Sequence, residues 1–317
     1  MKKYRFILVV VATLICGCSG SHEIFVTPVN PPRVCAAYFA MVDGAYDKAM
    51  SVKNNIPWDK VNRVYIAFAT LDDNGLLTNL QVNGSTGEAD KRIRTIISQC
   101  RSAQPKAEIY IVSNFGGEMN ARYLAAAKNP QGFANSVLAY LKSYGLDGFD
   151  MDWETYNIDD YAVPLKTILT TTYKTLKASG ISPSGGTYKL SHTIWPGVHS
   201  PETVASIKDC VDEINLMTYG TGPAYSLEEY APQYSAAGFP YSKMVAGVES
   251  EFGYSDNEGP DTEASVSAKA DFVKKNKLAG MFSWRLDNDM CATEGTGDEG
   301  PPTFQVAKWV YKYLHLR

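Results

Sequence analysis

The sequence lacks several features that define whole classes of protein. Only 6 of its 317 residues are cysteine and only 20% are charged, with 30 Lys and Arg against 34 Asp and Glu. These proportions exclude a disulfide-dense miniprotein, a coiled coil and a disordered tail. No basic stripe stands out either, which argues against a protein that binds nucleic-acid phosphates. What remains is an ordinary globular chain, 45% hydrophobic, that is long enough for one large barrel or two domains.

A short basic and apolar segment opens the chain. Lys2, Lys3 and Arg5 precede an apolar run over residues 6–15. This run is too short for a membrane-spanning helix, which needs about 20 residues, but it suits the apolar part of a secretory signal peptide. We therefore predict that residues 1–17 are removed on export and take no part in the fold.

The end of this apolar run resembles the lipobox of bacterial lipoproteins. It reads Ile-Cys-Gly-Cys, and the resemblance implies that Cys18 becomes the lipidated first residue of an exported protein. Several acyl chains on one cysteine anchor a protein stably, so we expect membrane contact through the lipid only, at the outer membrane or cell surface. A plain signal peptide cut nearby is the alternative. Residues 18–33 hold three prolines and no sustained periodicity, and we predict a tether there.

The cysteines outside the export signal are far apart in sequence and have no CxxC spacing. They are Cys35, Cys100, Cys210 and Cys291. Their spacing argues against metal binding by thiolates. An exported chain could pair them, and a core of this size does not need disulfides, so their pairing stays open.

From residue 34 to residue 317, short apolar runs alternate with amphipathic stretches. The runs predict strands at Val34–Ala40, Arg63–Thr70, Glu108–Ser113, Gly148–Trp153, Lys189–Ile194, Glu213–Tyr219, Met244–Val248 and Met281–Trp284. The helical patterns cover Ala89–Ser102, Ala121–Ser143, Asp159–Ala178, Ala264–Asn276 and Phe304–Leu314. Eight strands alternating with helices favour a single-domain α/β fold, the (β/α)8 or TIM barrel, although a doubly wound open sheet has the same alternation.

Acidic residues alternate with apolar ones at the end of the fourth expected strand. This stretch reads DGFDMDWE from Asp147, and the two-residue period of a strand places Asp150, Asp152 and Glu154 on one face. Same-face neighbours are about 7 Å apart, so like charges disfavour full ionisation of the row. At least one of these acids should hold a proton near neutrality, as protonation of a glycosidic oxygen requires. A calcium site is the alternative, but the glycine and twelfth-position glutamate of an EF-hand are absent, and we expect no metal or cofactor.

The string DGFDMDWE resembles the DGxDxDxE signature of the family 18 glycoside hydrolases, which are chitinases and endo-β-N-acetylglucosaminidases. Other segments are similar to further motifs of this family in the same order. They are VYIAFA at 64–69 in the second strand, SNFGG at 113–117 as a loose SxGG turn, MTY at 217–219 and WRLDND at 284–289. The resemblance covers nearly all of the expected mature chain and favours one barrel over an open sheet.

This resemblance implies a role for each residue that matches a motif. Glu154 would protonate the leaving oxygen and later activate water as a base. Asp152 would hold the 2-acetamido group of the substrate, whose carbonyl oxygen attacks the anomeric carbon, and Asp150 would share a proton or hydrogen bond with Asp152. Tyr219 would donate its hydroxyl to the acetamido oxygen. Trp284 would form the floor of the sugar site, because an indole face matches the apolar face of a pyranose.

Further residues are expected near the substrate, although no catalytic role is assigned to them. Tyr38 and Phe68 end the first two strands and either line the groove or pack in the core. Met217 belongs to the MTY motif, and Asp147 opens the DGxDxDxE motif, where we expect it to shape the strand rather than to react. The acids Glu249 and Glu251 follow the seventh strand, and they have no assigned role. The same holds for His192 and His199.

The chain departs from the family pattern in two places that bear on the substrate. Gly220 follows the MTY motif where many chitinases have aspartate, which removes a substrate-facing carboxylate. The connection between the seventh and eighth strands is too short for the α+β insertion that walls the deep groove of many chitinases. We therefore predict a shallow, open cleft and endo-type cleavage.

Three functions are compatible with these residues. The form of the Asp152-Trp153-Glu154 segment favours a chitinase-like enzyme, which would act on an oligo- or polysaccharide containing N-acetylglucosamine and retain anomeric configuration. The second is an endo-β-N-acetylglucosaminidase that cuts the chitobiose core of N-glycans. The third is a non-catalytic, chitinase-like surface protein that binds glycans, which the presence of Glu154 disfavours. We expect a monomer.

Overall fold

The structure is a computed structural model that describes residues 33–315, apart from 114–118, 221, 223–225, 254–258 and 293–299. The predicted signal peptide, the lipidation site Cys18 and the tether up to residue 32 lie outside the described residues. None of the described helices combines the length and the apolar character that crossing a bilayer demands.

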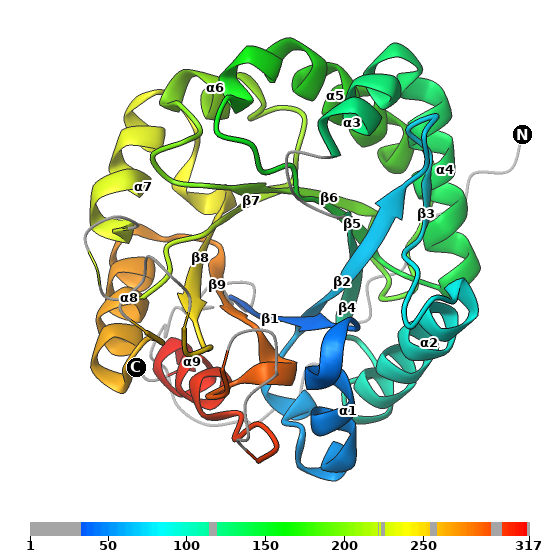
Figure 1. Cartoon of the computed structure of the whole chain (residues 1–317). Coiled ribbons are helices and arrows are strands. Elements are labelled where there is room, and N and C mark those ends of the chain that lie inside the picture. The colour runs from blue at the N-terminus through cyan, green and yellow to red at the C-terminus, as the bar shows by residue number, and fades with distance from the viewer. Residues whose placement is uncertain are drawn as a thin grey trace, which may run out of the picture. The chain divides into compact units, whose positions relative to one another are not determined.

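In the described part of the chain, eight parallel strands close into a barrel, and β9 pairs with both β8 and β1 (Figure 1). They are β1 (Val34–Ala40), β2 (Arg63–Leu71), β4 (Glu108–Ser113), β5 (Gly148–Met151), β6 (Lys189–Ile194), β7 (Glu213–Leu216), β8 (Met244–Glu249) and β9 (Gly280–Trp284). The predicted TIM barrel is confirmed, and the open sheet is excluded because the first and last strands pair. A short strand, β3 (Leu77–Asn79), adds to β2 in antiparallel direction and was not predicted.

Helices surround this barrel, as Figure 1 shows. They are α1 (Asp43–Ser51), α2 (Thr86–Ala103), α3 (Asn120–Lys128), α4 (Pro130–Tyr144), α5 (Ala162–Lys177), α6 (Pro201–Ser206), α7 (Leu227–Ala236), α8 (Glu263–Asn276) and α9 (Gln305–His315). The single helix predicted over 121–143 is wrong, because the chain breaks at Asn129. The Asn129 side chain accepts a hydrogen bond from the Gly132 amide at 3.1 Å, and Pro130 occupies the first turn of α4. Both features start a new helix.

Aromatic side chains fill the barrel interior. The rings of Tyr38 and Tyr65 stack with centroids 4.6 Å apart, and Tyr65 meets Tyr110 edge-on at 5.1 Å. Gly148 on β5 leaves room for this packing, because a Cβ atom there would lie 2.8 Å from the Tyr110 ring. The barrel is therefore a packed core, and a substrate can enter only at one of its ends.

One end of the barrel is closed by a buried arginine. Arg63 begins β2 and is 3% exposed, and its guanidinium forms ion pairs with Glu108 and Glu213 at the starts of β4 and β7. It also donates to the Tyr65 hydroxyl at 3.1 Å. The paired guanidinium closes the amino-terminal end of the barrel, so the carboxyl ends of the strands form the accessible mouth.

The remaining expectations on the scaffold concern the cysteines and the last connection. Cys35, Cys100, Cys210 and Cys291 are all described, and they are buried thiols rather than disulfides. Burial raises the pKa of the Cys35 and Cys100 thiols to about 12, so these two are unreactive. Between β8 and β9, the described residues form α8 and short connecting segments, and no α+β insertion is present among them.

Candidate active site

The acidic row lies at the mouth of the barrel, on and just after β5. Phe149, Met151 and Trp153 all belong to the core between strands and helices, whereas Asp150 and Asp152 are buried on the inner side. The predicted alternation is thus confirmed. The strand itself ends at Met151, two residues earlier than predicted, and side-chain contacts hold the chain beyond it. Chief among these, Trp153 donates its indole N–H to Asn120 at 2.7 Å.

Asp150 is held by four hydrogen bonds that come from three other strands. Its Oδ1 accepts from Ser191 at 2.6 Å and from Asn215 at 3.2 Å. Its Oδ2 accepts from the Tyr38 hydroxyl at 2.8 Å and from Thr193 at 2.9 Å. Each donor points inward from a different position on β1, β6 or β7. The carboxyl group of Asp150 therefore has a fixed orientation. Its charge raises the pKa of the nearby Asp152.

Asp152 is fixed through its backbone, whereas its side chain keeps an unused acceptor. Its amide donates to Ser113 Oγ at 3.1 Å, and its carbonyl accepts from the Tyr123 hydroxyl at 2.8 Å. Ser113 begins the SNFGG turn predicted from the sequence, whose residues 114–117 lie outside the described residues. The side chain is 4% exposed, and its Oδ1 is buried without a hydrogen-bond partner. A buried carboxyl oxygen left in this state is suited to a donor brought by a ligand.

Burial raises the pKa of every member of the row, and repulsion from neighbouring acids adds to the rise for Asp152. Burial raises the pKa of Asp150, and its four hydrogen bonds oppose this rise only in part. Burial, followed by the charges of Glu154 and Asp150, raises the pKa of Asp152 well above its usual range. Burial also raises the pKa of Glu154 to about 7, although its hydrogen bond with Asp152 lowers it. The row therefore holds protons near neutrality, as the sequence predicts.

Tyr219 lies at the same end of the barrel as the acidic row, just beyond the end of β7. It is 6% exposed, and its ring meets Phe282 edge-on with centroids 6.0 Å apart. Gly247 on β8 leaves room for the Tyr219 ring, because a Cβ atom at this glycine would lie 2.8 Å from Cε1 of Tyr219. Met217 packs in the same inner cluster as Tyr219, Tyr38 and Phe282.

The turn after Tyr219 is held by a buried ion pair between Lys269 on α8 and Asp261, which precedes that helix. The ammonium group of Lys269 donates to the carbonyls of Thr218 at 2.6 Å and Gly220 at 2.9 Å, and it pairs with Asp261 at 2.8 Å. Asp261 in turn accepts from the Gly220 amide at 3.0 Å. Gly220 has a φ of 68°, which suits glycine best. The residue that departs from the family pattern is thus clamped from both of its backbone groups.

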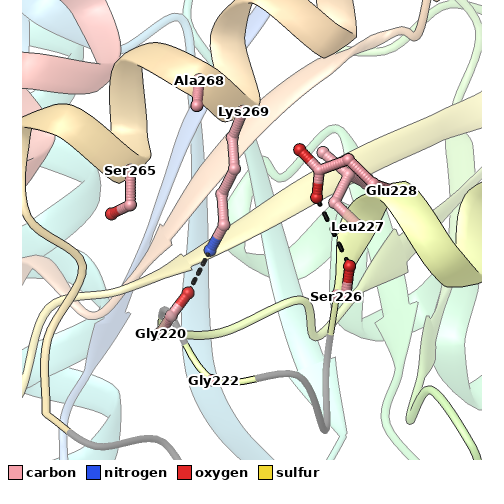
Figure 2. A pocket seen from close by; sticks show the side chains of 8 residues that line it. All are labelled: Gly220, Gly222, Ser226, Leu227, Glu228, Ser265, Ala268 and Lys269. Atoms are coloured by element: carbon pink, nitrogen blue, oxygen red, sulfur yellow. Dashed lines mark hydrogen bonds between the residues drawn. The ribbon is translucent and has the colours of Figure 1, made fainter.

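A cavity of about 200 Å³ lies behind this turn (Figure 2). In Figure 2, Lys269 extends from α8 to the Gly220 carbonyl, and Ser226 faces Glu228. The lining residues are Gly220, Gly222, Ser226, Leu227, Glu228, Ser265, Ala268 and Lys269. None of the three carboxyl groups of the row lines the cavity, so we place no reacting substrate there.

Trp284 ends β9 and is oriented by a buried acid. Its indole N–H donates to Glu251 Oε2 at 3.0 Å, and Glu251 Oε1 accepts from Asn288 at 2.5 Å. The ring lies 5.4 Å from that of Tyr38 and 6.0 Å from that of Phe68. The structure thus brings the predicted groove residues together at one mouth and gives Glu251 a positioning role that sequence reasoning left open.

Asp147 is the predicted substrate-side residue that the structure places elsewhere. It precedes β5 and lies at the opposite end of that strand from Glu154. It is 1% exposed, and it accepts from Arg101, from the Ile109 amide at 2.9 Å and from the Ser184 amide at 2.7 Å. We therefore assign Asp147 a structural role, joining three segments below the barrel, as its sequence position suggested.

Glu249, His192 and His199, which had no assigned role, are buried in the protein. Glu249 is fully buried, and its Oε1 accepts from the amides of Ser250 and Glu251, both at 2.8 Å. Burial lowers the pKa of His192 to about 4 and that of His199 to about 3, so both rings are neutral at physiological pH. Among the described residues, no group of three or more His, Cys, Asp or Glu is arranged to hold a metal ion.

Three donors to Asp150 were missed from the sequence, namely Ser191, Thr193 and Asn215. A signal for two of them exists in β6, where Ser191 and Thr193 alternate with Leu190, His192 and Ile194 on the other face, of which Leu190 and Ile194 belong to the outer core. The two-residue period would have placed both on the inner face with Asp150. The same signal exists for Asn215 in the shorter β7, where polar Glu213 and Asn215 alternate with the buried apolar residues Ile214 and Leu216.

The comparisons with known proteins identify a family and a shared fold. The sequence model of the family described as "Glycosyl hydrolases family 18" matches residues 36–251. Chitinase B of Serratia marcescens is 28% identical over 192 residues, which cover 53% of this chain and 36% of that protein. This chain therefore spans only about a third of the length of that curated relative.

Solved structures share the fold at low sequence identity. A mutant of the Class V chitinase of Nicotiana tobaccum in complex with NAG4 superposes with a TM-score of 0.69 at 16% identity, covering 90% of this chain and 99% of that one. The chitinase-like agglutinin of Robinia pseudoacacia has a TM-score of 0.67 at 15% identity, covering 89% and 99%. These likenesses concern the fold and leave the activity to the site residues.

Proposed function

The chain belongs to the glycosyl hydrolases family 18, and from this premise we propose that it is a retaining, endo-acting hydrolase of β-1,4 linkages next to N-acetylglucosamine, similar to a chitinase. The observation that carries the proposal is the buried carboxyl row, in which Glu154 has a pKa of about 7 beside Asp152. The Class V chitinase structure in complex with NAG4 supports a substrate of this chemistry.

In the proposed first step, the substrate supplies its own nucleophile. Glu154 gives its proton to the glycosidic oxygen while the carbonyl oxygen of the 2-acetamido group attacks the anomeric carbon. The bond to the leaving sugar breaks, and a cyclic oxazolinium ion forms. The Glu154 carboxylate then takes a proton from water, which attacks the same carbon and reopens the ring. Two inversions at one carbon retain its configuration.

Asp152 is suited to orient the acetamido group. Its Oδ1 is buried without a partner, and an acetamido N–H would provide the missing donor. The buried row around it is a low-dielectric site, where such a hydrogen bond favours the charged intermediate. Tyr219, just beyond β7, would donate to the acetamido oxygen, and Trp284, held by Glu251, would support the sugar ring from below.

Product masses test the proposed substrate. Incubation with chitin oligomers should release shorter oligomers, whereas a high-mannose glycoprotein should stay intact. Cleavage of the glycoprotein alone would assign the chain to the endo-β-N-acetylglucosaminidases. If neither substrate is cut although Glu154 is intact, the proposed activity is wrong.

The pH dependence follows from the raised pKa of Glu154. With its ordinary pKa of 4.5, only about one Glu154 in three hundred would be protonated at pH 7, whereas a pKa of about 7 leaves half of them protonated. Since the acid form gives the proton, kcat/KM should fall about tenfold per pH unit above pH 7. Steady-state rates between pH 5 and 9 measure this. A fall that begins near pH 5 would contradict the raised pKa of Glu154.

A further inference from the structure

An exposed aromatic pair lies next to the acidic row, on the outer side of the mouth. Tyr156 follows Glu154 by two residues and is 83% exposed, whereas Trp195, just beyond β6, is half-buried. Their ring centroids are 4.8 Å apart, and the planes are inclined by 50°. Single exposed apolar residues are common on protein surfaces, but two aromatic rings in contact beside a catalytic acid need another explanation.

Both rings are carried by fixed segments. The Trp195 amide donates to Nδ1 of His199 at 3.1 Å, and the Trp195 carbonyl accepts from the His199 amide at 3.0 Å. Tyr156 follows the buried Thr155, whose carbonyl accepts from the amide of the equally buried Ile158 at 3.1 Å. Tyr156 is therefore presented to solvent by an anchored turn, and its ring is preorganised for a ligand.

The pair continues the aromatic lining of the mouth. Trp195 packs against the inner cluster that contains Tyr219 and Met217, and Trp284 packs against the same cluster. β5 lies four strands from β9 in either direction around the barrel, so Tyr156 and Trp284 stand on opposite sides of the mouth. Glu154 is on the Tyr156 side. A sugar on Trp284 that reacts with Glu154 thus has its leaving group toward Tyr156.

We propose that Tyr156, backed by Trp195, is a stacking platform for the sugar on the leaving-group side of a β-linked N-acetylglucosamine oligosaccharide. This rests on the proposed function. The ring faces carry partial negative charge, which attracts the axial C–H groups of a chair-form pyranose. Because the two rings are inclined, they do not form one flat surface, so the exposed Tyr156 face contacts the sugar and Trp195 supports it from the side.

The test compares substrates that reach the platform with one that does not. In Tyr156→Ala, kcat/KM for chitohexaose should fall roughly threefold to tenfold, and product masses should shift toward cleavage with fewer sugars on the leaving side. Chitobiosyl fluoride loses only a fluoride ion and cannot contact Tyr156, so its hydrolysis should be unchanged. Tyr156→Phe keeps the ring and should behave as wild type. Val163→Ala on α5, which removes an apolar side chain that is 77% exposed, is the matched control.

The outcomes separate the platform from the proposed function. Equal losses on both substrates would mean that Tyr156 acts through the fold, which overturns the platform, and so would unchanged hydrolysis of chitohexaose. In a Glu154→Gln background, adding Tyr156→Ala should weaken chitohexaose binding by the same factor, and this binding needs no turnover. If Glu154→Gln fails to bind chitohexaose at all, both the platform and the proposed substrate are wrong.

Discussion

Replacing Glu154 with glutamine should lower kcat on chitin oligomers by about 10²-fold to 10⁴-fold, the contribution typical of a general acid. Glutamine has nearly the same shape but carries no proton that it can give to the leaving oxygen, and it cannot activate water afterwards. Binding of the oligomer should persist because the aromatic walls and Asp152 are untouched. Steady-state rates and calorimetric titration with chitohexaose measure the two quantities.

The residual activity of Glu154→Gln gives a second readout. In wild type, the raised pKa of Glu154 sets the fall in rate above pH 7. The variant lacks this titration, so its rate should show no fall near pH 7. A variant with normal turnover, or one whose pH profile is unchanged, would assign the acid to another residue.

Replacing Asp152 with asparagine should lower kcat by about 10²-fold to 10³-fold, comparable with the loss of one electrostatic contact to a charged intermediate. The neutral amide stabilises the oxazolinium less and can turn its NH2 group toward the acetamido N–H. Since an amide still donates a hydrogen bond to Glu154, the fall in rate should stay near pH 7. Steady-state rates of this variant across the pH range test both statements.

Asp152→Ala is the matched comparison. The hydrogen bond with Asp152 lowers the pKa of Glu154. Its removal in Asp152→Ala should therefore raise the pKa of Glu154 and shift the fall in rate to higher pH. The Asp152→Asn and Asp152→Ala variants should therefore differ in pH profile, although both lose turnover. Unchanged kcat in Asp152→Asn would exclude the acetamido role of this residue.

The local part of the site could be predicted from the sequence. Side chains in a strand alternate between its two faces, so Asp150 and Asp152 share one face. This inference uses only the local sequence and needs no knowledge of the rest of the chain. Seven of the eight expected strands begin where the structure has them, and Met281–Trp284 begins one residue late. The early end of β5 was not predicted, since the side-chain contacts that hold Trp153 come from another segment.

The supports of the site could not be predicted, because they join residues far apart in sequence. The contact between Glu251 and Trp284 spans 33 positions, and the one between Lys269 and Thr218 spans 51. The WRLDND motif shows the same limit. Asp287 accepts from the Ala40 amide at 2.8 Å, and Asp289 accepts from three amides at the start of α9. These acids hold the scaffold together, which spacing within the motif does not reveal.

The pairing of β1 with β9 has a consequence for how the chain reaches its native state. Val34 pairs with Gly280 and Ala37 with Ser283, so the ring closes only when residues almost 250 positions apart meet. Contacts of such separation make folding slow. During synthesis, β1 is made first and keeps one unpaired edge until β9 follows. An incomplete chain that ends before β9 would therefore expose the edges of β1 and β8 and tend to aggregate.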